Sequence, residues 1–450
     1  MASNKKNLSA DDLLSLVEES GVKFIDLQFC DIGGTLKNIT IPKSELESTL
    51  NHGIWFDGSS VEGFARIAES DMYLIPDPDT FAILPWLGGN ETTARLVCNV
   101  HTPGGLPFLG DPRIVLKNVL NEAEKMGFTY NIGPELEFFL FKTGPDGVLI
   151  PPQPQDSAGY FDQPVDMVAT VLWRQITEGL SAFGIETETM HHEVAAGQHE
   201  IDFRYSDALK AADNIVIFRA FVKIMAQQRN MYATFMPKPI RGLSGSGMHV
   251  HQSLSFKANG TNAFSDPGDA HGLSKIAKHF IAGQLKHARA ICAILAPLVN
   301  SYKRLVQGYE APVQISWGRI NRSALIRIPR AYTTESTRIE LRNPDPSCNP
   351  YLAFAAMLAA GLDGIRKELP VPEANEENIY TSGASQKGSQ LNVLPVSLEE
   401  AVNELEKDTV IREALGAHVF DRFIIAKREE WEDYRLEVTS WELNKYLRTL

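Results

Sequence analysis

The sequence predicts an α+β protein of two parts, in which a mostly antiparallel sheet is flanked by long helices. Strand-like and helix-like segments both occur along the 450 residues, but they do not alternate strictly, as a parallel α/β fold would require. A chain of this length favours two domains over one small core. Residues 101–113 are rich in Pro and Gly, and we place the domain boundary between residues 105 and 106.

Composition and charge fit a globular protein and argue against several functional classes. The 44% hydrophobic and 22% charged residues are ordinary globular values. A net charge of -13 argues against a general nucleic-acid binder, which is normally basic. The four cysteines form no CxxC pair, so the sequence predicts neither a zinc ribbon nor a disulfide framework. With no apolar signal core at the start and no apolar run long enough for a bilayer, we expect a cytoplasmic protein without membrane contact.

The first part should contain one helix and several strands. Ser9 is placed to cap a helix over residues 11–20, which a glycine ends. Residues 22–34 and 36–41 predict two strands around a Gly-Gly turn, and residues 91–100 predict another strand after a loop-rich region.

The second part should combine long helices with strands. Helical patterns cover residues 113–127, 166–184 and 274–295. Residues 351–362 are almost entirely apolar and predict a buried helix, since the run is too short to span a bilayer. The strands between these helices carry most of the residues that could bind a ligand or take part in catalysis.

The first such strand lies within residues 129–141. Glu135 and Glu137 share one face there, about 7 Å apart at their Cα atoms, and apolar residues separate them. Two carboxylates this close repel each other unless a cation or a proton lies between them. A solvated sheet face gives the same pattern, so this strand alone does not distinguish the two interpretations.

Three further segments repeat the pattern of polar groups at strand spacing beside an apolar face. They carry Glu193 and Glu200 across a Gly-containing turn, His249, His251 and Ser253 on one strand, and Arg338, Glu340 and Arg342 on another. One such strand is ordinary. Four in one domain predict a sheet whose concave side is a polar site.

These strands supply five glutamates and one histidine that suit a hard divalent cation. The six residues are Glu135, Glu137, Glu193, Glu200, His249 and Glu340. Such a set fits Mg²⁺ or Mn²⁺ better than zinc or copper, which favour Cys or more His. Because Mg²⁺ keeps several water ligands, six protein ligands predict two or more ions. A lone histidine on a strand is usually structural, and His249 becomes a candidate only beside the acids.

Arginines supply the other half of a phosphate site. Five lie within residues 302–330, namely Arg304, Arg319, Arg322, Arg327 and Arg330. Metals, arginines and a Gly-rich backbone together hold a phosphoryl group during transfer. A basic surface hairpin is the alternative, but apolar residues and two prolines are interleaved with these arginines. The Gly-rich loop at residues 238–247 is not a Walker loop, because no GK[ST] follows it.

Seven motifs in a fixed order resemble those of the bacterial type I glutamine synthetases. They span residues 56 to 365 and read FDGSSVEGFARIAESDMYL, GPELEFFLF, HHEVAAGQHEIDF, KPIRGLSGSGMHVHQSL, YKRLVQGYEAPV, NRSALIRIP and RIELRNPDPSCNPYLAFAAMLAAGLDGI. The resemblance implies a small N-terminal β-grasp domain over residues 1–105 and a larger catalytic domain with a curved sheet over residues 106–450. The chain lacks the insertion typical of adenylylated members and so resembles the shorter, feedback-inhibited alpha-type class.

The resemblance also implies a reaction. ATP, glutamate and ammonium would give ADP, phosphate and glutamine through γ-glutamyl phosphate, with ATP as a substrate. The metals would neutralise the negative charges that keep a carboxylate from attacking the γ-phosphate. A γ-glutamyl-amine or polyamine ligase on the same fold is the alternative. A non-catalytic relative is disfavoured, because all six metal-ligand positions are present.

Two sets of metal ligands follow from the same resemblance. Glu137, Glu193 and Glu200 match the ligands of one ion, and Glu135, His249 and Glu340 match those of a second ion that bridges the phosphates. The positions that match nucleotide contacts are Glu188, His251, Ser253, Arg322 and Arg327. Arg322 and Arg342 also match arginines near the transferred phosphoryl group and the glutamate, and we expect both to be catalytic.

For glutamate and ammonium, the resemblance assigns both binding and catalytic residues. Arg304 matches the clamp on the α-carboxylate, and Gly245 lies where the backbone approaches the substrate. Glu310 matches a flap residue that closes the site and helps to collect the proton of ammonium. Asp57 matches the residue that binds ammonium in a neighbouring subunit's active site. Ser244 departs from the usual asparagine that contacts the substrate amino acid, and its shorter side chain puts glutamate affinity in question.

Assembly and regulation are further expectations from the resemblance. The family forms dodecamers of two stacked hexameric rings. Arg66 matches an arginine that takes part in glutamine inhibition in the alpha-type class, whose members also bind small nitrogen-response repressors. Tyr380 aligns loosely with a tyrosine that other members adenylylate, but the missing insertion argues against that modification here.

Overall fold

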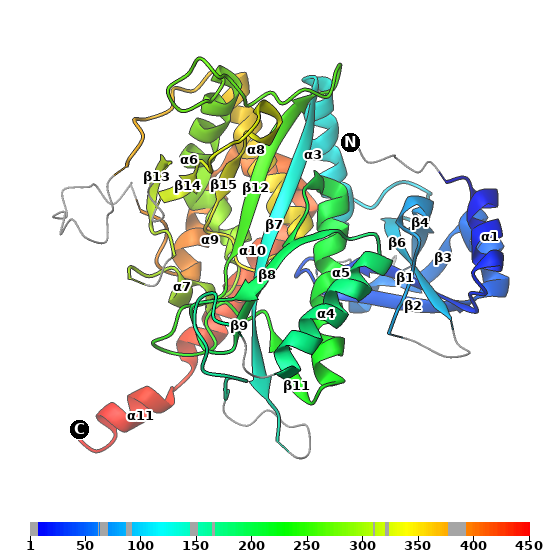
Figure 1. The fold of residues 1–450 in the computed structure, drawn as a ribbon, viewed down its shortest axis with the longest axis horizontal. Helices are drawn as coiled ribbons and strands as arrows, with labels where there is room; N and C mark the ends of the chain where they lie inside the picture. The colour runs from blue at the N-terminus through cyan, green and yellow to red at the C-terminus, as the bar shows by residue number, and fades with distance from the viewer. Residues whose placement is uncertain are drawn as a thin grey trace.

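The computed structural model describes residues 8–61, 63, 71–86, 92–144, 152–163, 167–308, 311–319, 324–376 and 393–450. Two sheets organise these residues, a smaller one near the N-terminus and a larger one covered by helices (Figure 1). The predicted α+β class, with a small N-terminal sheet and a larger, mostly antiparallel sheet flanked by helices, is confirmed. No helix in the described ranges combines the length and apolar character needed to cross a membrane.

The N-terminal sheet has the order β2-β1-β6-β4-β3, with β5 paired to β6. Its elements are α1 (Ala10–Glu19), β1 (Phe24–Cys30), β2 (Leu36–Pro42), α2 (Leu46–His52), β3 (Ile54–Asp57), β4 (Asp71–Pro76), β5 (Ala82–Ile83) and β6 (Thr93–His101). Ser9 caps α1 in a reciprocal pair of hydrogen bonds with Asp12, as predicted. β1 and β6 run parallel, and α1 covers a core that includes Leu13 and Leu96.

The larger sheet has the order β13-β14-β15-β12-β7-β9-β8, and β10 and β11 also pair with β7. Its strands are β7 (Phe128–Lys142), β8 (Thr187–His192), β9 (Gln198–Phe203), β10 (Ser206–Asp207), β11 (Met231–Thr234), β12 (Met248–Phe256), β13 (Gln314–Gly318), β14 (Ala324–Arg327) and β15 (Ile339–Leu341). β13 and β14 are parallel, and the other pairs are antiparallel. The long strand β7 is therefore the centre on which the site is built.

Helices pack against the larger sheet and bury its apolar side chains (Figure 1). The helices of this part of the chain are α3 (Pro112–Lys125), α4 (Met167–Ala182), α5 (Ala208–Gln227), α6 (Lys275–Leu295), α7 (Ser301–Arg304), α8 (Pro350–Arg366), α9 (Leu398–Lys407), α10 (Thr409–Leu436) and the projecting α11 (Ser440–Tyr446). Short 3-10 turns cover Lys43–Glu45, Gly58–Ser60, Pro78–Thr80 and Thr334–Ser336. The buried apolar helix predicted at residues 351–362 is α8, which Asn349 caps and Pro350 begins.

A buried arginine joins the two sheets. Arg113, near the start of α3, donates to Asp213 of α5 at 3.0 and 2.9 Å. It also donates to Asn99 of β6 and to Asp77, both at 2.8 Å. Tyr351 of α8 adds a hydrogen bond to Asp213 at 2.7 Å. Because Arg113 is almost fully buried, these contacts fix α3, α5 and α8 against the N-terminal sheet.

Candidate active site

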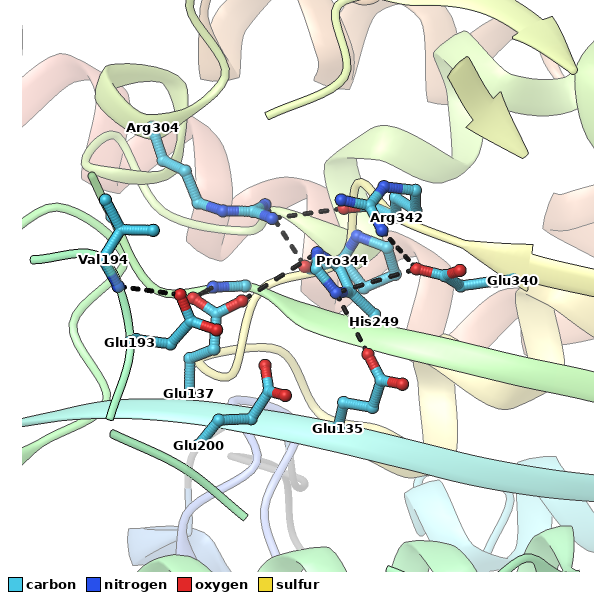
Figure 2. Close-up of polar contacts among 12 residues, drawn as sticks. Glu135, Glu137, Glu193, Val194, Glu200, His249, Arg304, Glu340, Arg342 and Pro344 are labelled. Carbon is cyan, nitrogen blue, oxygen red and sulfur yellow. Dashed lines mark hydrogen bonds and ion pairs between the residues drawn. The ribbon is translucent and has the colours of Figure 1, made fainter. Parts of the chain in front are cut away.

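Strand register brings the predicted acids together. Glu137 on β7 lies opposite Glu200 on β9, and Glu135 lies opposite His249 on β12. On the next strand, Glu340 of β15 lies opposite His251 of β12. Residues at period two on each strand project to the same face, so four strands present one polar surface (Figure 2).

The first group of acids is buried. Glu137 accepts hydrogen bonds from the Gly247 amide at 2.9 Å and the Gln198 side chain at 2.8 Å. Burial, and then the charge of Glu193, raises the pKa of Glu137. Burial, followed by the nearby charge of Glu137, raises the pKa of Glu200. The alternative of a solvated strand face is therefore wrong, since Glu137 is only 7% exposed and Glu200 6%.

Glu193 lies at the edge of this group. It follows β8 and accepts from the Val194 amide at 2.9 Å, while His191 Nε2 lies 3.1 Å from its Oε1. The ligand atoms that fall within 4.8 Å of one another belong to Glu137, Glu200 and His249. The Glu193 carboxylate nevertheless lies beside that of Glu137 (Figure 2), at the rim of the same group.

The second group contains Glu135, His249 and Glu340, whose ligand atoms also lie within 4.8 Å of one another. His249 Nδ1 is 3.2 Å from Glu135 Oε2, and His251 Nε2 is 2.6 Å from Glu135 Oε1. Although burial opposes it, these histidine contacts hold the pKa of Glu135 well below its usual range. The grouping is the one predicted for the second metal.

Two arginines neutralise Glu340. Its Oε2 accepts from Arg327 Nη1 at 2.7 Å. Its Oε1 accepts from Arg342 Nη1 (Figure 2). Glu340 is fully buried, so the pairing offsets the cost of an isolated charge in the interior. A cation bound to Glu340 would share this carboxylate with the arginines.

The donor set fits hard divalent cations. Carboxylate oxygens dominate, one imidazole joins both groups, and no cysteine is among the ligand atoms gathered in the described residues. Mg²⁺ and Mn²⁺ prefer such oxygen-rich sites. Burial and then mutual repulsion raise the pKa values of Glu137 and Glu200, and a bound cation would offset both costs of the charged form.

Arg304 lies beside the first group and is 3% exposed. Its Nη1 donates to the carbonyls of Asn343 at 3.0 Å and Pro344 at 3.2 Å, and its Nη2 donates to the carbonyl of Arg342 at 3.2 Å (Figure 2). These bonds use three of the five N–H donors of a guanidinium. The remaining donors are available to an anionic ligand.

The arginine-rich segment divides into two kinds of residue. Arg304 and Arg327 reach the polar surface through the contacts above, whereas Arg319 and Arg330 are exposed. Arg322 lies outside the described residues. A purely surface hairpin is thus ruled out by the buried Arg304, whereas a phosphate-binding role for Arg319 and Arg330 stays a prediction.

The Gly-rich loop packs against its own chain. The carbonyl of Gly245 accepts from Gln198 Nε2 at 3.2 Å, and a Cβ at Gly245 would lie 2.2 Å from the Pro237 carbonyl oxygen. Ser244 beside it is half-buried. The sequence interpretation explained these glycines by approach to a substrate. The structure adds a second reason, because the loop could not close on Pro237 with a side chain at residue 245.

The predicted nucleotide residues are spread along the sheet. His251 and Ser253 share the polar face of β12, and Arg327 ends β14. Arg338 Nε donates to His251 Nδ1 at 3.2 Å. Glu188 is exposed on the edge strand β8 and belongs to neither of the two acid groups.

Asp57 is not near the acid groups within its own chain. It ends β3 in the N-terminal sheet, is exposed, and accepts from the Ser59 amide at 2.9 Å. β3 lies away from β7 and β12 (Figure 1). Glu310, Arg66 and Tyr380 lie outside the described residues.

Three polar residues of the site were missed in the sequence. Asp202 continues the period-two pattern of Glu200 on β9 and lies opposite Glu135. Gln198 and His191 bind Glu137 and Glu193 through the contacts given above. Extending the strand pattern by one step would have found Asp202, whereas the roles of Gln198 and His191 depend on the β8–β9 turn.

Comparison with known proteins agrees with this geometry. Residues 21–103 match the family model "Glutamine synthetase, beta-Grasp domain", and residues 109–446 match "Glutamine synthetase, catalytic domain". The glutamine synthetase of Thermotoga maritima is 51% identical over 443 residues, covering 98% of this chain and 100% of that protein.

Two further comparisons reach the same result. The glutamine synthetase of Thermus thermophilus is 52% identical over 444 residues, covering 97% of this chain and 98% of that protein. A solved structure titled "GmaS/ADP complex-Conformation 1" superposes with a TM-score of 0.88 at 36% identity, covering 97% of this chain and 99% of that one. Since the matches span both sheets and nearly the whole chain, the protein belongs to the glutamine synthetase family.

Proposed function

We propose that this protein is a glutamate–ammonia ligase, which joins ammonium to the γ-carboxylate of L-glutamate with ATP and releases glutamine, ADP and phosphate. The observation that carries the proposal is the convergence of Glu135, Glu137, Glu200 and Glu340 with His249 and two arginines on one sheet face. Relatives named glutamine synthetase, about half identical over the full length, support it. The γ-glutamyl-amine ligase alternative is not favoured.

The six ligands would hold two divalent cations, Mg²⁺ or Mn²⁺. We assign one to Glu137, Glu193 and Glu200 and the other to Glu135, His249 and Glu340. When bound, the cations would neutralise phosphate and carboxylate charge. The protein itself would hold the carboxylates close together and away from water. The burial of Glu137, Glu200 and Glu340 supports this role.

The arginines would orient the anionic groups. Arg327 and Arg342, already held by Glu340, would face the phosphates, and Arg322 would join them and contact both the nucleotide and glutamate. Arg304 would bind the α-carboxylate of glutamate through the N–H donors that its carbonyl contacts leave over. The nucleotide would contact Glu188, His251 and Ser253.

Glutamate and ammonium would be held by the loop and by two acids. The backbone of Ser244 and Gly245 would line the glutamate site. Glu310 would close it and help to collect the ammonium proton. Asp57, distant from the acids of its own chain, would serve the site of a neighbouring subunit and bind ammonium there.

The direct test is phosphate release from ATP in the presence of Mg²⁺ and glutamate, comparing ammonium, methylamine and putrescine as acceptors. Ammonium-dependent release that is lost in Glu340→Ala is expected. Glu335→Gln is the matched control, because that acid is exposed on the 3-10 turn and should leave the rate unchanged. Release only with the amines would move the protein to the γ-glutamyl-amine ligases.

We also propose a homo-oligomer, as a dodecamer of two hexameric rings in which residues 1–105 complete the active site of the neighbouring subunit. The exposed position of Asp57 supports shared sites. The terminal helix α11 supports the association of subunits, because none of its residues is buried and it projects from the molecule (Figure 1). The four free and buried cysteines agree with a reducing cytoplasm.

Regulation follows the alpha-type class in this proposal. Arg66 would take part in glutamine inhibition, and a nitrogen-response repressor would be a partner of the inhibited enzyme. Undiminished glutamine inhibition in Arg66→Ala would overturn the first point. Tyr380 would stay unmodified, and mass spectrometry that finds AMP on Tyr380 in cells would contradict the class assignment.

A further inference from the structure

A second cluster of metal-ligating side chains lies behind the acid groups. Asp156, His192 and His199 each offer a ligand atom, and these atoms lie within 4.8 Å of one another. His192 ends β8 and lies directly opposite His199 on β9. Because successive residues of a strand point to opposite faces, His199 projects away from the face that carries Glu200. The cluster is therefore separate from the proposed active site.

Two groups in this cluster are buried without a protein partner. His199 is fully buried, and neither of its ring nitrogens has a hydrogen-bond partner among the described residues. The rings of Phe138, Trp173 and His192 surround it. Asp156 Oδ2 is likewise buried and unpaired within the described ranges. Buried polar atoms normally find partners, so both groups point to a ligand between them.

The bonds of the other two residues fit a metal site. His192 Nδ1 lies 2.7 Å from the Glu193 carbonyl, to which it donates if the proton is on Nδ1. Nε2 of the same ring then faces Asp156 Oδ1 at 2.9 Å. A backbone carbonyl on the second ring nitrogen is the usual arrangement for a metal-bound histidine. The Gly197 amide donates to Asp156 Oδ1 at 2.9 Å and fixes the carboxylate.

We propose that Asp156, His192 and His199 form a binding site for one transition-metal ion, with Zn²⁺ as the best fit. Two imidazoles and one carboxylate suit zinc better than the Mg²⁺ or Mn²⁺ favoured by the oxygen-rich groups. A tetrahedral zinc ion holds its ligand atoms about 3.4 Å apart. The three ligand atoms already lie within 4.8 Å of one another, so small side-chain shifts would suffice to bind it. The Asp156 side chain is 13% exposed, which leaves an approach from solvent and a fourth position for water.

The site would brace the β8–β9 turn. His192 directly precedes Glu193, and His199 directly precedes Glu200. An ion that ties both histidines to Asp156 would fix the two strand ends from which Glu193 and Glu200 project. Its role is positioning, and its occupancy does not depend on which reaction the protein catalyses.

The test is zinc content after equilibrium dialysis of the full-length protein against Zn²⁺ in a large excess of Mg²⁺. We expect one zinc per chain, with at least tenfold weaker binding in Asp156→Asn and in His199→Gln. His52→Gln, which changes an exposed histidine of α2, should keep the zinc. Glu340→Gln should also keep it, because that change affects only the proposed active site.

X-ray absorption at the zinc edge supplies a second readout. Two imidazole ligands are expected for this cluster, whereas each ligand group found on the acid face of the described residues contains one imidazole, from His249 or from His191. If His199→Gln fails to fold, Asp156→Asn still tests zinc binding. This variant should fold, because Asp156 lies in a partly exposed segment outside the sheet. The proposal is overturned if no zinc binds, if Asp156→Asn retains zinc, or if the spectrum shows at most one imidazole. His192 and Asp156 would then form only an ion pair.

Discussion

Arg304 lies so close to the backbone of Gly247 that a Cβ atom at residue 247 would fall 2.4 Å from Arg304 Nη2. The same Cβ would lie 3.2 Å from Oε1 of Glu137. The absence of a side chain at residue 247 thus lets a guanidinium and a buried carboxylate share one small space. The Gly247 amide uses this closeness to donate to Glu137.

Gly247→Ala should therefore displace Arg304 and Glu137 together. If Arg304 binds the glutamate α-carboxylate, we expect KM for glutamate to rise about tenfold or more, since a lost charge-assisted contact corresponds to roughly 1.5–3 kcal/mol. KM for ATP should change less. Steady-state kinetics with each substrate varied would measure both effects. Gly104→Ala is the control, because a Cβ there meets only Thr102 Oγ1, at 3.9 Å. Equal changes in both KM values would argue against the assignment of Arg304.

Ser244 tests whether the loop contacts glutamate through its side chain or its backbone. The residue is half-buried beside Gly245, whose carbonyl is fixed by Gln198. If the backbone makes the contact, Ser244→Ala should leave KM for glutamate within about twofold, since the substrate would lose no hydrogen bond. Ser244→Asn should lower that KM by adding a longer amide. A large rise in KM in Ser244→Ala would show that the hydroxyl itself binds the substrate.

The chemistry of the site was predictable because it follows strand spacing. Glu135 and Glu137 on β7, and Glu340 with Arg342 at β15, share faces as period two requires. The capped first helix and the apolar helix α8 were predictable for the same reason, since local patterns specify them. The acid groups follow once the strands pair in register.

Contacts between distant segments could not be predicted. Nothing in the sequence links Arg113 with Asp77 and Asp213, because their meeting depends on how two sheets pack. The ligand atom that lies within 4.8 Å of those of Glu137 and Glu200 belongs to His249 and not to Glu193. This arrangement depends on side-chain directions at a turn, which the sequence does not specify. The Asp156 cluster was hidden for a similar reason, since Asp156 lies outside any strand and 36 residues before His192.

Removal of Arg113 should destabilise the junction between the sheets. In Arg113→Met, the carboxylate of Asp213 stays buried without its cation, and loss of one partner of a buried pair costs roughly 3–5 kcal/mol. We expect the thermal unfolding midpoint to fall by several degrees. Arg366→Met is the control, because its pair with Glu122 at 3.2 Å is exposed and should contribute little. An unchanged midpoint in Arg113→Met would mean that the network is dispensable for the junction.

The stability of the metal-free protein should fall as the pH rises. Burial and then Glu193 raise the pKa of Glu137 to about 8, above roughly 4.3 in an unfolded chain. The folded state holds the proton more tightly, so this stabilisation is complete below the unfolded pKa and is lost as the pH rises through the folded one. Unfolding midpoints of chelator-treated protein should therefore decrease from about pH 4.5 and level off at about pH 8. Mg²⁺ should reverse the loss, because it replaces the proton.

Glu200→Gln supplies the matched variant for this prediction. Glu200 faces Glu137, and burial and repulsion raise its pKa as well. A neutral amide there removes one charge from the pair, so the decrease of the midpoint with pH should be smaller in the variant. A midpoint of the metal-free wild type that rises with pH would contradict the repulsion between these acids.

Truncation after Leu436 should disrupt the assembly and leave each subunit folded. The segment beyond α10 exposes Val438, Trp441, Leu443, Tyr446 and Leu447 to solvent. An apolar surface of this kind on a projecting helix is typical of a contact with another subunit. None of the residues of α11 is buried, so its loss should not change the circular dichroism per residue beyond the missing turns. Light scattering should then show smaller particles than the full-length protein, while Lys445→Ala, which keeps the apolar residues, should assemble normally. A truncated protein of unchanged assembly size would show that α11 does not join subunits.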